Sequence, residues 1–212
     1  MYEQHPSRTL NSLFQRRPYQ GAEPEESLFL FVGLDANYDA AVEELPVFDK
    51  VVEYHSDGAA FWRRYGVHHP FLLPPYRGDG QRYHQNFARI GFGPTDADKV
   101  SFIELLHVPT VGRNRLAPED FDAPHLERIN RLITAGVRRY VFVSAGVVGL
   151  MRRTGRFGWL SRAGRSVEIL PTLFATGETQ VRLHLHFSNY GKFQAQMESE
   201  ARGIRMILEA ER

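Results

Sequence analysis

Short, continuous apolar runs separated by helix-like segments are the feature of this 212-residue chain that most restricts its fold. Three of these runs, at residues 28–33, 101–106 and 140–144, have the length and composition of strands buried on both faces. Residues 181–186 instead alternate apolar and polar side chains, as do residues 167–170. This alternation predicts a half-covered strand or a hairpin near the C-terminus.

Amphipathic helical patterns lie between and after these runs, at residues 118–135, 145–153 and 192–210. Strands that alternate with helices form mainly parallel sheets with helices on both faces. The sequence therefore predicts an α/β fold: a three-layer α/β/α sandwich around a mainly parallel four-stranded sheet, with room for an extra C-terminal hairpin strand.

Two segments carry no clear periodicity. Residues 1–26 contain three prolines before the first apolar run and are predicted to be an irregular N-terminal arm, followed by a single domain over residues 27–212. Residues 66–80 are rich in proline, histidine and glycine, which indicates a long surface loop.

Composition excludes several classes of protein. The chain has no cysteine, so disulfides and thiolate zinc sites are impossible. No apolar run approaches the roughly 20 residues of a membrane helix, and the N-terminus lacks the apolar core of a secretory signal. We therefore expect a cytoplasmic protein that acts as a monomer without a membrane. The net charge of +1 argues against coating nucleic acid by charge alone.

Polar residues interrupt or follow three of the predicted strands. Asp35 follows the first run, Glu104 lies inside the second, and His186 ends the last. Ligands of parallel sheets bind at the carboxyl ends of the strands, so these side chains are expected on one rim. Asp35 and His186 also fit structural roles, as a turn residue and a packed histidine. Glu104 is harder to explain structurally, because a charge inside an apolar strand is costly unless it is paired or used.

Four short motifs occur in an order that resembles the uracil-DNA glycosylase superfamily. The stretch Gly33-Leu-Asp-Ala36 is similar to its first motif, and His186-Phe-Ser188 to its second, although Ala36 and Phe187 replace the prolines of both. Two further stretches, Ala60–Arg63 and Glu104–Thr110, resemble segments of the mismatch-specific uracil/thymine branch. The matches span nearly the whole chain from residue 28.

The resemblance implies a monofunctional DNA glycosylase, which flips out a base and hydrolyses its N-glycosidic bond without a metal or cofactor. Asp35 would stabilise the sugar cation and position the attacking water, and His186 would donate a hydrogen bond to the departing base. No lysine stands at a matching position, so no Schiff-base lyase step is expected.

Glu104, Asn37, Tyr38 and Phe48 are the candidates for base recognition that the resemblance implies. Glu104 stands where the family has a uracil-reading asparagine. An ionised carboxylate only accepts hydrogen bonds, which disfavours uracil O4 and suits the exocyclic amine of cytosine. Asn37 replaces a bulky tyrosine and leaves room for a C5 substituent. These departures predict a C5-modified cytosine, excised in defence against phage with modified DNA; uracil or mismatch repair is the alternative.

DNA contacts are expected from the loop after the second motif. Tyr190 is the candidate wedge between base steps, and Ser188 a candidate phosphate contact. Asn189, Lys192 and Arg113 complete the predicted DNA-binding set.

Two other classes of function remain open. His184 and His186 project to the same face of a strand, and with Asp35 or residues 68–69 they would suit a metal-dependent hydrolase. Alternatively, the substituted motifs fit an inactive nucleic-acid-binding module that has kept the fold.

Overall fold

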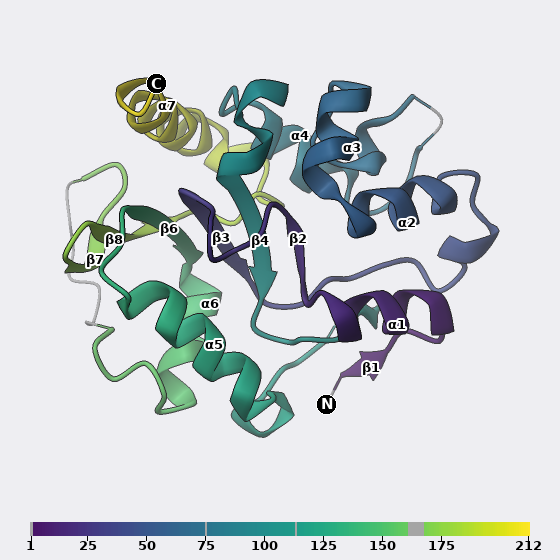
Figure 1. Cartoon of the computed structure of the whole chain (residues 1–212), viewed down its shortest axis with the longest axis horizontal. Helices are drawn as coiled ribbons and strands as arrows, with labels where there is room; N and C mark the ends of the chain where they lie inside the picture. The colour runs from purple at the N-terminus through teal and green to yellow at the C-terminus, as the bar shows by residue number, and fades with distance from the viewer. Residues whose placement is uncertain (1, 75, 113, 161–167) are drawn as a thin grey trace.

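A computed structural model of the chain describes residues 2–74, 76–112, 114–160 and 168–212. Its centre is a mixed six-stranded sheet (Figure 1). In spatial order the strands are β2 (Tyr19–Gly21), β4 (Val100–Glu104), β3 (Phe29–Gly33), β6 (Arg139–Ser144), β8 (Thr179–His184) and β7 (Thr172–Thr176). Neighbours from β4 to β8 pair in parallel, and β2 and β7 pair antiparallel at the two edges.

Helices pack on both faces of this sheet (Figure 1). They are α3 (Gly58–Tyr65), α4 (Gln81–Ala88), α5 (Ala123–Thr134), α6 (Ala145–Arg153) and α7 (Gln194–Ala210). Helices α1 (Arg8–Arg16) and α2 (Phe48–Ser56) pack instead with the segment after β3 in a separate apolar cluster. A separate two-stranded sheet joins β1 (Glu3–Gln4) to β5 (Thr110–Val111). Within the described ranges no helix has the length and apolarity needed to cross a membrane.

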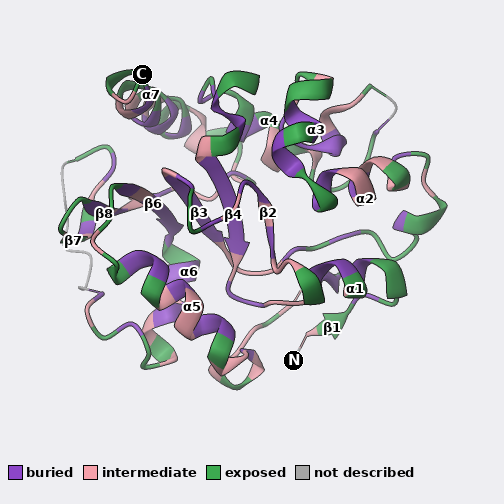
Figure 2. Ribbon diagram, viewed as in Figure 1, coloured by how far each residue is buried: buried purple, intermediate pink, exposed green. Residues whose placement is uncertain are grey.

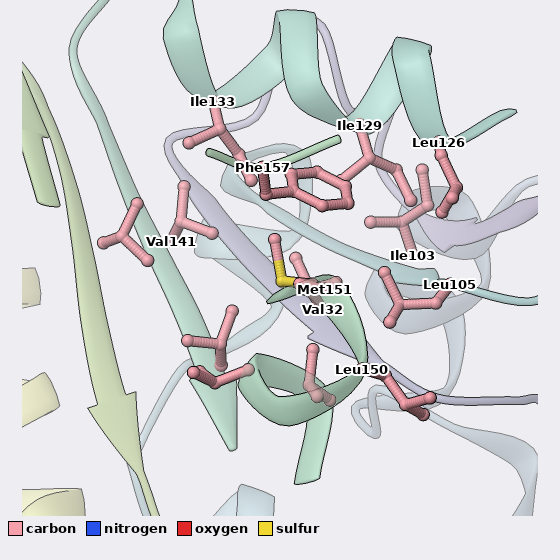
Figure 3. Packing of buried hydrophobic residues seen from close by; sticks show 14 of the residues in the cluster. Val32, Ile103, Leu105, Leu126, Ile129, Ile133, Val141, Leu150, Met151 and Phe157 are labelled. Carbon is pink, nitrogen blue, oxygen red and sulfur yellow. The ribbon is translucent and has the colours of Figure 1, made fainter. Parts of the chain in front are cut away.

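Helices α5 and α6 cover one face through aliphatic side chains (Figure 3). Asp122 caps α5 by accepting a hydrogen bond from the His125 amide, at 2.8 Å. Ile129 and Ile133 then point one turn apart toward Val141 of β6, and all three are fully buried. Full burial of one such side chain contributes about 1.5–3 kcal/mol. The helix is therefore held mainly by this apolar stripe.

The opposite face is aromatic and is covered by α3, α4 and α7. Phe31 of β3 stacks between Phe102 of β4 and Phe142 of β6, with ring centroids 5.5 and 5.0 Å away. Phe87 of α4 meets Phe31 edge-on at 5.1 Å, and Ile204 of α7 joins the same cluster. The buried strands and exposed outer helix surfaces are evident in Figure 2.

The predicted α/β class is confirmed, but the sheet has six strands rather than four. The four longest apolar or alternating runs form β3, β4, β6 and β8. The strand expected at 167–170 is wrong for residues 168–170, because the hairpin partner of β8 is β7, closer to the turn; residue 167 lies outside the described residues.

Two segments without clear periodicity are more ordered than predicted. The predicted arm over residues 1–26 is not irregular in its described part, residues 2–26: this part contains α1, capped by Ser7, and β2, which pairs with β4. Leu10, Leu13 and Phe14 of α1 are buried and anchor it. Residues 66–80 are not simply a surface loop either, since their histidines and aromatic residues pack inward: His68, His69, Phe71 and Tyr76.

Candidate active site

The segments that follow β3 and β4 continue side by side beyond the sheet. Gly33 is paired with Glu104 in the parallel register. The Leu105 and Leu106 amides then donate to the carbonyls of residues 33 and 34, at 3.0 and 2.9 Å, and the Thr110 amide donates to the Ala36 carbonyl at 2.9 Å. Asp35 is thereby held next to the segment that ends in Thr110.

Asp35 is oriented by two neutral donors. Its Oδ2 accepts hydrogen bonds from Thr110 Oγ1 at 2.6 Å and from Asn114 Nδ2 at 2.8 Å. Thr110 is fully buried, and β1 pairs with its strand from the other side. Among the described residues, none donates to Oδ1, so this oxygen can accept a hydrogen bond from a ligand or a water.

Glu104 occupies the space that a side chain at position 33 would fill. A Cβ atom on Gly33 would lie only 1.8 Å from Glu104 Oε2. Burial raises the pKa of the Glu104 carboxyl to about 8, and the nearby Asp35 carboxylate adds to the rise. In the described part of the chain no group is hydrogen-bonded to this carboxyl. A raised pKa favours the neutral form of the Glu104 carboxyl at pH 7, whereas the sequence alone suggested an ionised carboxylate.

His186 is held in one tautomer. Its Nδ1 accepts the backbone amide of Ser188 at 3.3 Å and lies 2.6 Å from Ser188 Oγ. Burial lowers the pKa of the imidazole, and the Asp35 carboxylate opposes that shift. The neutral ring therefore carries its proton on Nε2, as a hydrogen-bond donor.

Helix α4 supports the loop that carries His186. Asn86 Nδ2 donates to the Phe187 and Asn189 carbonyls, at 2.5 and 3.2 Å. One turn earlier, the Arg82 guanidinium lies 4.6 Å from the centroid of the Tyr190 ring. Tyr190 is 67% exposed, and a surface hollow of about 610 Å³ is lined by residues 188–193, Lys192 included.

The three predicted rim residues stand at or just after the ends of three different strands, and Asp35 lies within electrostatic range of both Glu104 and His186. Tyr83 of α4 connects the group, because its ring lies 5.4 Å from that of His186 and its pKa is raised by burial and by Glu104. Sequence patterns gave no signal for Tyr83.

The other candidates for base recognition lie differently. Tyr38 is buried, its hydroxyl accepts from Gln20 Nε2 at 2.6 Å, and its pKa is raised by burial and by Glu104. Asn37 is exposed, and its amide donates to the Gly112 carbonyl at 2.6 Å. Phe48 begins α2 and packs against the cluster that contains Tyr38, without a contact to Asp35, Glu104 or His186 within the described residues.

Several supporting residues were missed and one candidate cannot be located. Thr110 and Asn114 orient Asp35, and Arg82 and Asn86 hold the loop; of these, only Thr110 fell within a motif. Arg113 lies outside the described residues.

The histidines do not form the ligand set that a metal-dependent hydrolase requires. His184 is buried beside Phe187, with ring centroids 4.7 Å apart, and burial lowers the pKa of its imidazole to about 3. His69 stacks on His84, with ring centroids 3.5 Å apart, and burial lowers the pKa of both imidazoles. Across the described ranges no three histidine, aspartate or glutamate side chains are grouped as a metal site.

No protein-family model matches this chain, and no curated protein is significantly similar to it in sequence.

Proposed function

We propose that this protein is a monofunctional DNA glycosylase that hydrolyses the N-glycosidic bond of an extruded nucleotide. The observation that carries the proposal is the electrostatic coupling of Asp35 to both Glu104 and His186, three side chains from separate strand ends. This rim, at the carboxyl ends of parallel strands, is where α/β proteins bind ligands.

Each group suits one part of the reaction. Cleavage builds positive charge on the sugar and negative charge on the base. The Asp35 carboxylate stabilises the cation, and its Oδ1 orients the attacking water. His186 donates its Nε2 proton in a hydrogen bond to the base oxygen, where negative charge grows. The Ser188 amide maintains this tautomer.

The loop after His186 supports extrusion of the base. Tyr190 is the wedge that fills the vacated base step, since its ring is exposed and backed by Arg82. Ser188, Asn189 and Lys192 contact the backbone of the DNA around it.

The substrate we propose is a C5-modified cytosine, which would suit defence against phage with modified DNA. Asn37 leaves the C5 side open, because its amide is turned to Gly112. A neutral Glu104 pairs with cytosine by donating to N3 and accepting from the amine. The same neutral group also pairs with uracil, by donating to O4 and accepting from N3–H. Uracil is therefore the second candidate substrate.

The helices on both faces fit a three-layer α/β/α sandwich, with the parallel strands β4, β3, β6 and β8 at its centre. We propose that the protein acts as a cytoplasmic monomer on DNA.

Mass spectrometry of bases released from DNAs that contain uracil, 5-hydroxymethylcytosine or glucosylated cytosine tests the activity. Asp35→Ala and His186→Ala should each slow release by about 10²–10⁴-fold while DNA binding persists. Asp39→Ala, an exposed aspartate four residues further on, is the matched control and should act as the wild type.

Two results would count against the proposal. DNA binding without release of any base would support an inactive binding module. Release that survives in Asp35→Ala would remove Asp35 from the chemistry.

A further inference from the structure

Glu104 is a carboxylic acid with an uncommitted proton on the rim of the candidate active site. Its Oε2 fills the space beside Gly33, and no described residue forms a hydrogen bond with the carboxyl. Because the carboxyl is half-buried and has no partner among the described side chains, its hydrogen-bonding capacity is open to a ligand in the site.

The surroundings of Glu104 keep its proton in place. The described titratable groups that act on it or contact it come from four segments: Asp35 and Tyr38 after β3, Tyr54 on α2, Tyr83 on α4, and His125 on α5. Asp35 brings a negative charge, and the tyrosines are neutral. His125 Nε2 is bonded to the main-chain oxygen of Glu104, at 2.8 Å, and forms no hydrogen bond with the carboxyl. Within the described part of the chain, none of these groups is a lysine or an arginine.

Cytosine-type bases need a proton to depart. Uracil has two carbonyls that spread the charge of the N1 anion, and its N3 already carries hydrogen. Cytosine has one carbonyl and an electron-releasing amine, so its N1 anion is a poor leaving group. A proton on N3 allows cytosine to leave as a neutral molecule, and a general acid at N3 supplies it.

We infer that Glu104 is the general acid of the proposed reaction and transfers its proton to N3 of an extruded cytosine-class base. The inference rests on the proposed glycosylase function. In the step, the Glu104 O–H bond breaks as N3–H forms, and the C1′–N1 bond breaks with its electron pair going to the base. Water oxygen bonds to C1′, and the proton that it loses passes to Asp35. The base leaves as its neutral N3–H tautomer, and Glu104 is left as a carboxylate. Proton exchange with solvent then reprotonates Glu104 and deprotonates Asp35.

This role explains why an acid stands here rather than an amide. A glutamine pairs with the same edge of cytosine, donating to N3 and accepting from the amine, but has no proton to transfer. Because a carboxyl with a pKa of about 8 stays protonated at neutral pH and is still acidic enough to release its proton, it suits the task.

Glu104→Gln therefore separates recognition from proton transfer. Single-turnover release is measured from duplexes with one 5-hydroxymethylcytosine or one 5-hydroxymethyluracil, between about pH 6 and 9. We expect the substitution to slow release of the cytosine by about 10²–10⁴-fold and that of the uracil by less than about tenfold. In the wild type, release of the cytosine should fall about tenfold per pH unit above about pH 8, a limb absent from the uracil reaction.

Affinity for a non-cleavable 2′-fluoroarabino analogue of the 5-hydroxymethylcytosine duplex tests whether recognition persists. It should change little in Glu104→Gln, and Glu209→Gln, on the exposed end of α7, should match the wild type throughout. Equal slowing of both bases would overturn the general-acid role and leave the glycosylase intact. A wild type that releases neither base would overturn the proposed function and the inference with it.

Discussion

The neutral state of Glu104 has a consequence for stability that is independent of any activity. In the unfolded chain this carboxyl has its ordinary pKa of 4.5, and in the folded protein burial and Asp35 raise its pKa to about 8. Between these two values the folded protein binds more protons than the unfolded chain. Its free energy of unfolding therefore falls as pH rises through this window. Below pH 4.5 the penalty is absent, and above pH 8 it is complete.

The size of the penalty follows from the two pKa values. At about 1.4 kcal/mol per pH unit, the interval corresponds to an upper limit of about 5 kcal/mol. Because Glu104 is half-buried and solvent relaxes around it, we expect roughly 2–4 kcal/mol. Glu104→Gln has nearly the same shape and does not titrate, so the variant should gain this much relative to the wild type between pH 5 and 9.

Urea denaturation of both proteins at several pH values measures the difference directly. Subtracting the free energy of unfolding of the wild type from that of the variant at each pH cancels the contributions of the other titrating groups. Glu209→Gln, a substitution at an exposed position, should show no pH-dependent gain. A constant offset between Glu104→Gln and the wild type from pH 5 to 9 would refute the raised pKa, and with it the neutral carboxyl in the site.

Three further predictions test the packing around the site. Gly33→Ala places a methyl group where Glu104 Oε2 lies and displaces the end of this flexible side chain toward water, so it should cost less than about 1 kcal/mol in urea denaturation and should weaken the pH dependence that the buried carboxyl causes; a pH dependence equal to that of the wild type would contradict the contact. Asn86→Leu removes the donor to the Phe187 and Asn189 carbonyls and should lower the free energy of unfolding by about 1–3 kcal/mol. It should also shift the NMR signals of the His186 ring, and unchanged signals would argue against the anchoring role. Ile133→Ala should lower the free energy of unfolding by about 2–5 kcal/mol, because it leaves a cavity under α5. Val137→Ala, at a half-exposed position, should lower it by less than about 0.5 kcal/mol. Equal losses would contradict the assignment of Ile133 to the core.

Sequence patterns predicted the helices and strands whose burial is visible in the order of their own apolar and polar side chains. β3 and the centre of β6 are apolar because both faces of these strands are covered, and α5 carries its apolar stripe at helical spacing. β2 has only three residues and becomes a strand because it pairs with the edge of β4. α4 buries little besides Asn86 and Phe87, so its sequence resembles that of a polar loop. Non-local pairing and a narrow buried face leave no periodic signal.

The same distinction applies to the candidate site. Asp35, Glu104 and His186 were expected on one rim because strand ends are recognisable and parallel strands share one edge. Thr110, Asn114 and Asn86 act through contacts with residues more than 70 positions away in sequence, which no local pattern encodes. The pKa of Glu104 also depends on burial and on the Asp35 carboxylate, 69 positions away in sequence, and its residue type alone does not reveal either effect.

The absence of a side chain at Gly33 determines much of the chemistry available at this rim. The parallel register aligns residue 33 of β3 with residue 104 of β4, and only glycine at 33 leaves room for the carboxyl between the strands. A larger residue would push the carboxyl toward water, where it would ionise near neutral pH and become an acceptor alone. Asp35, two residues further along the same segment, then contributes the charge that keeps its neighbour protonated. Gly33 and Asp35 thus act on Glu104 in the same direction: Gly33 leaves space for the carboxyl beside its strand, and Asp35 opposes its ionisation. A short motif after a single strand can in this way place a carboxylate and a carboxylic acid on one rim, which is the pair that the proposed hydrolysis requires.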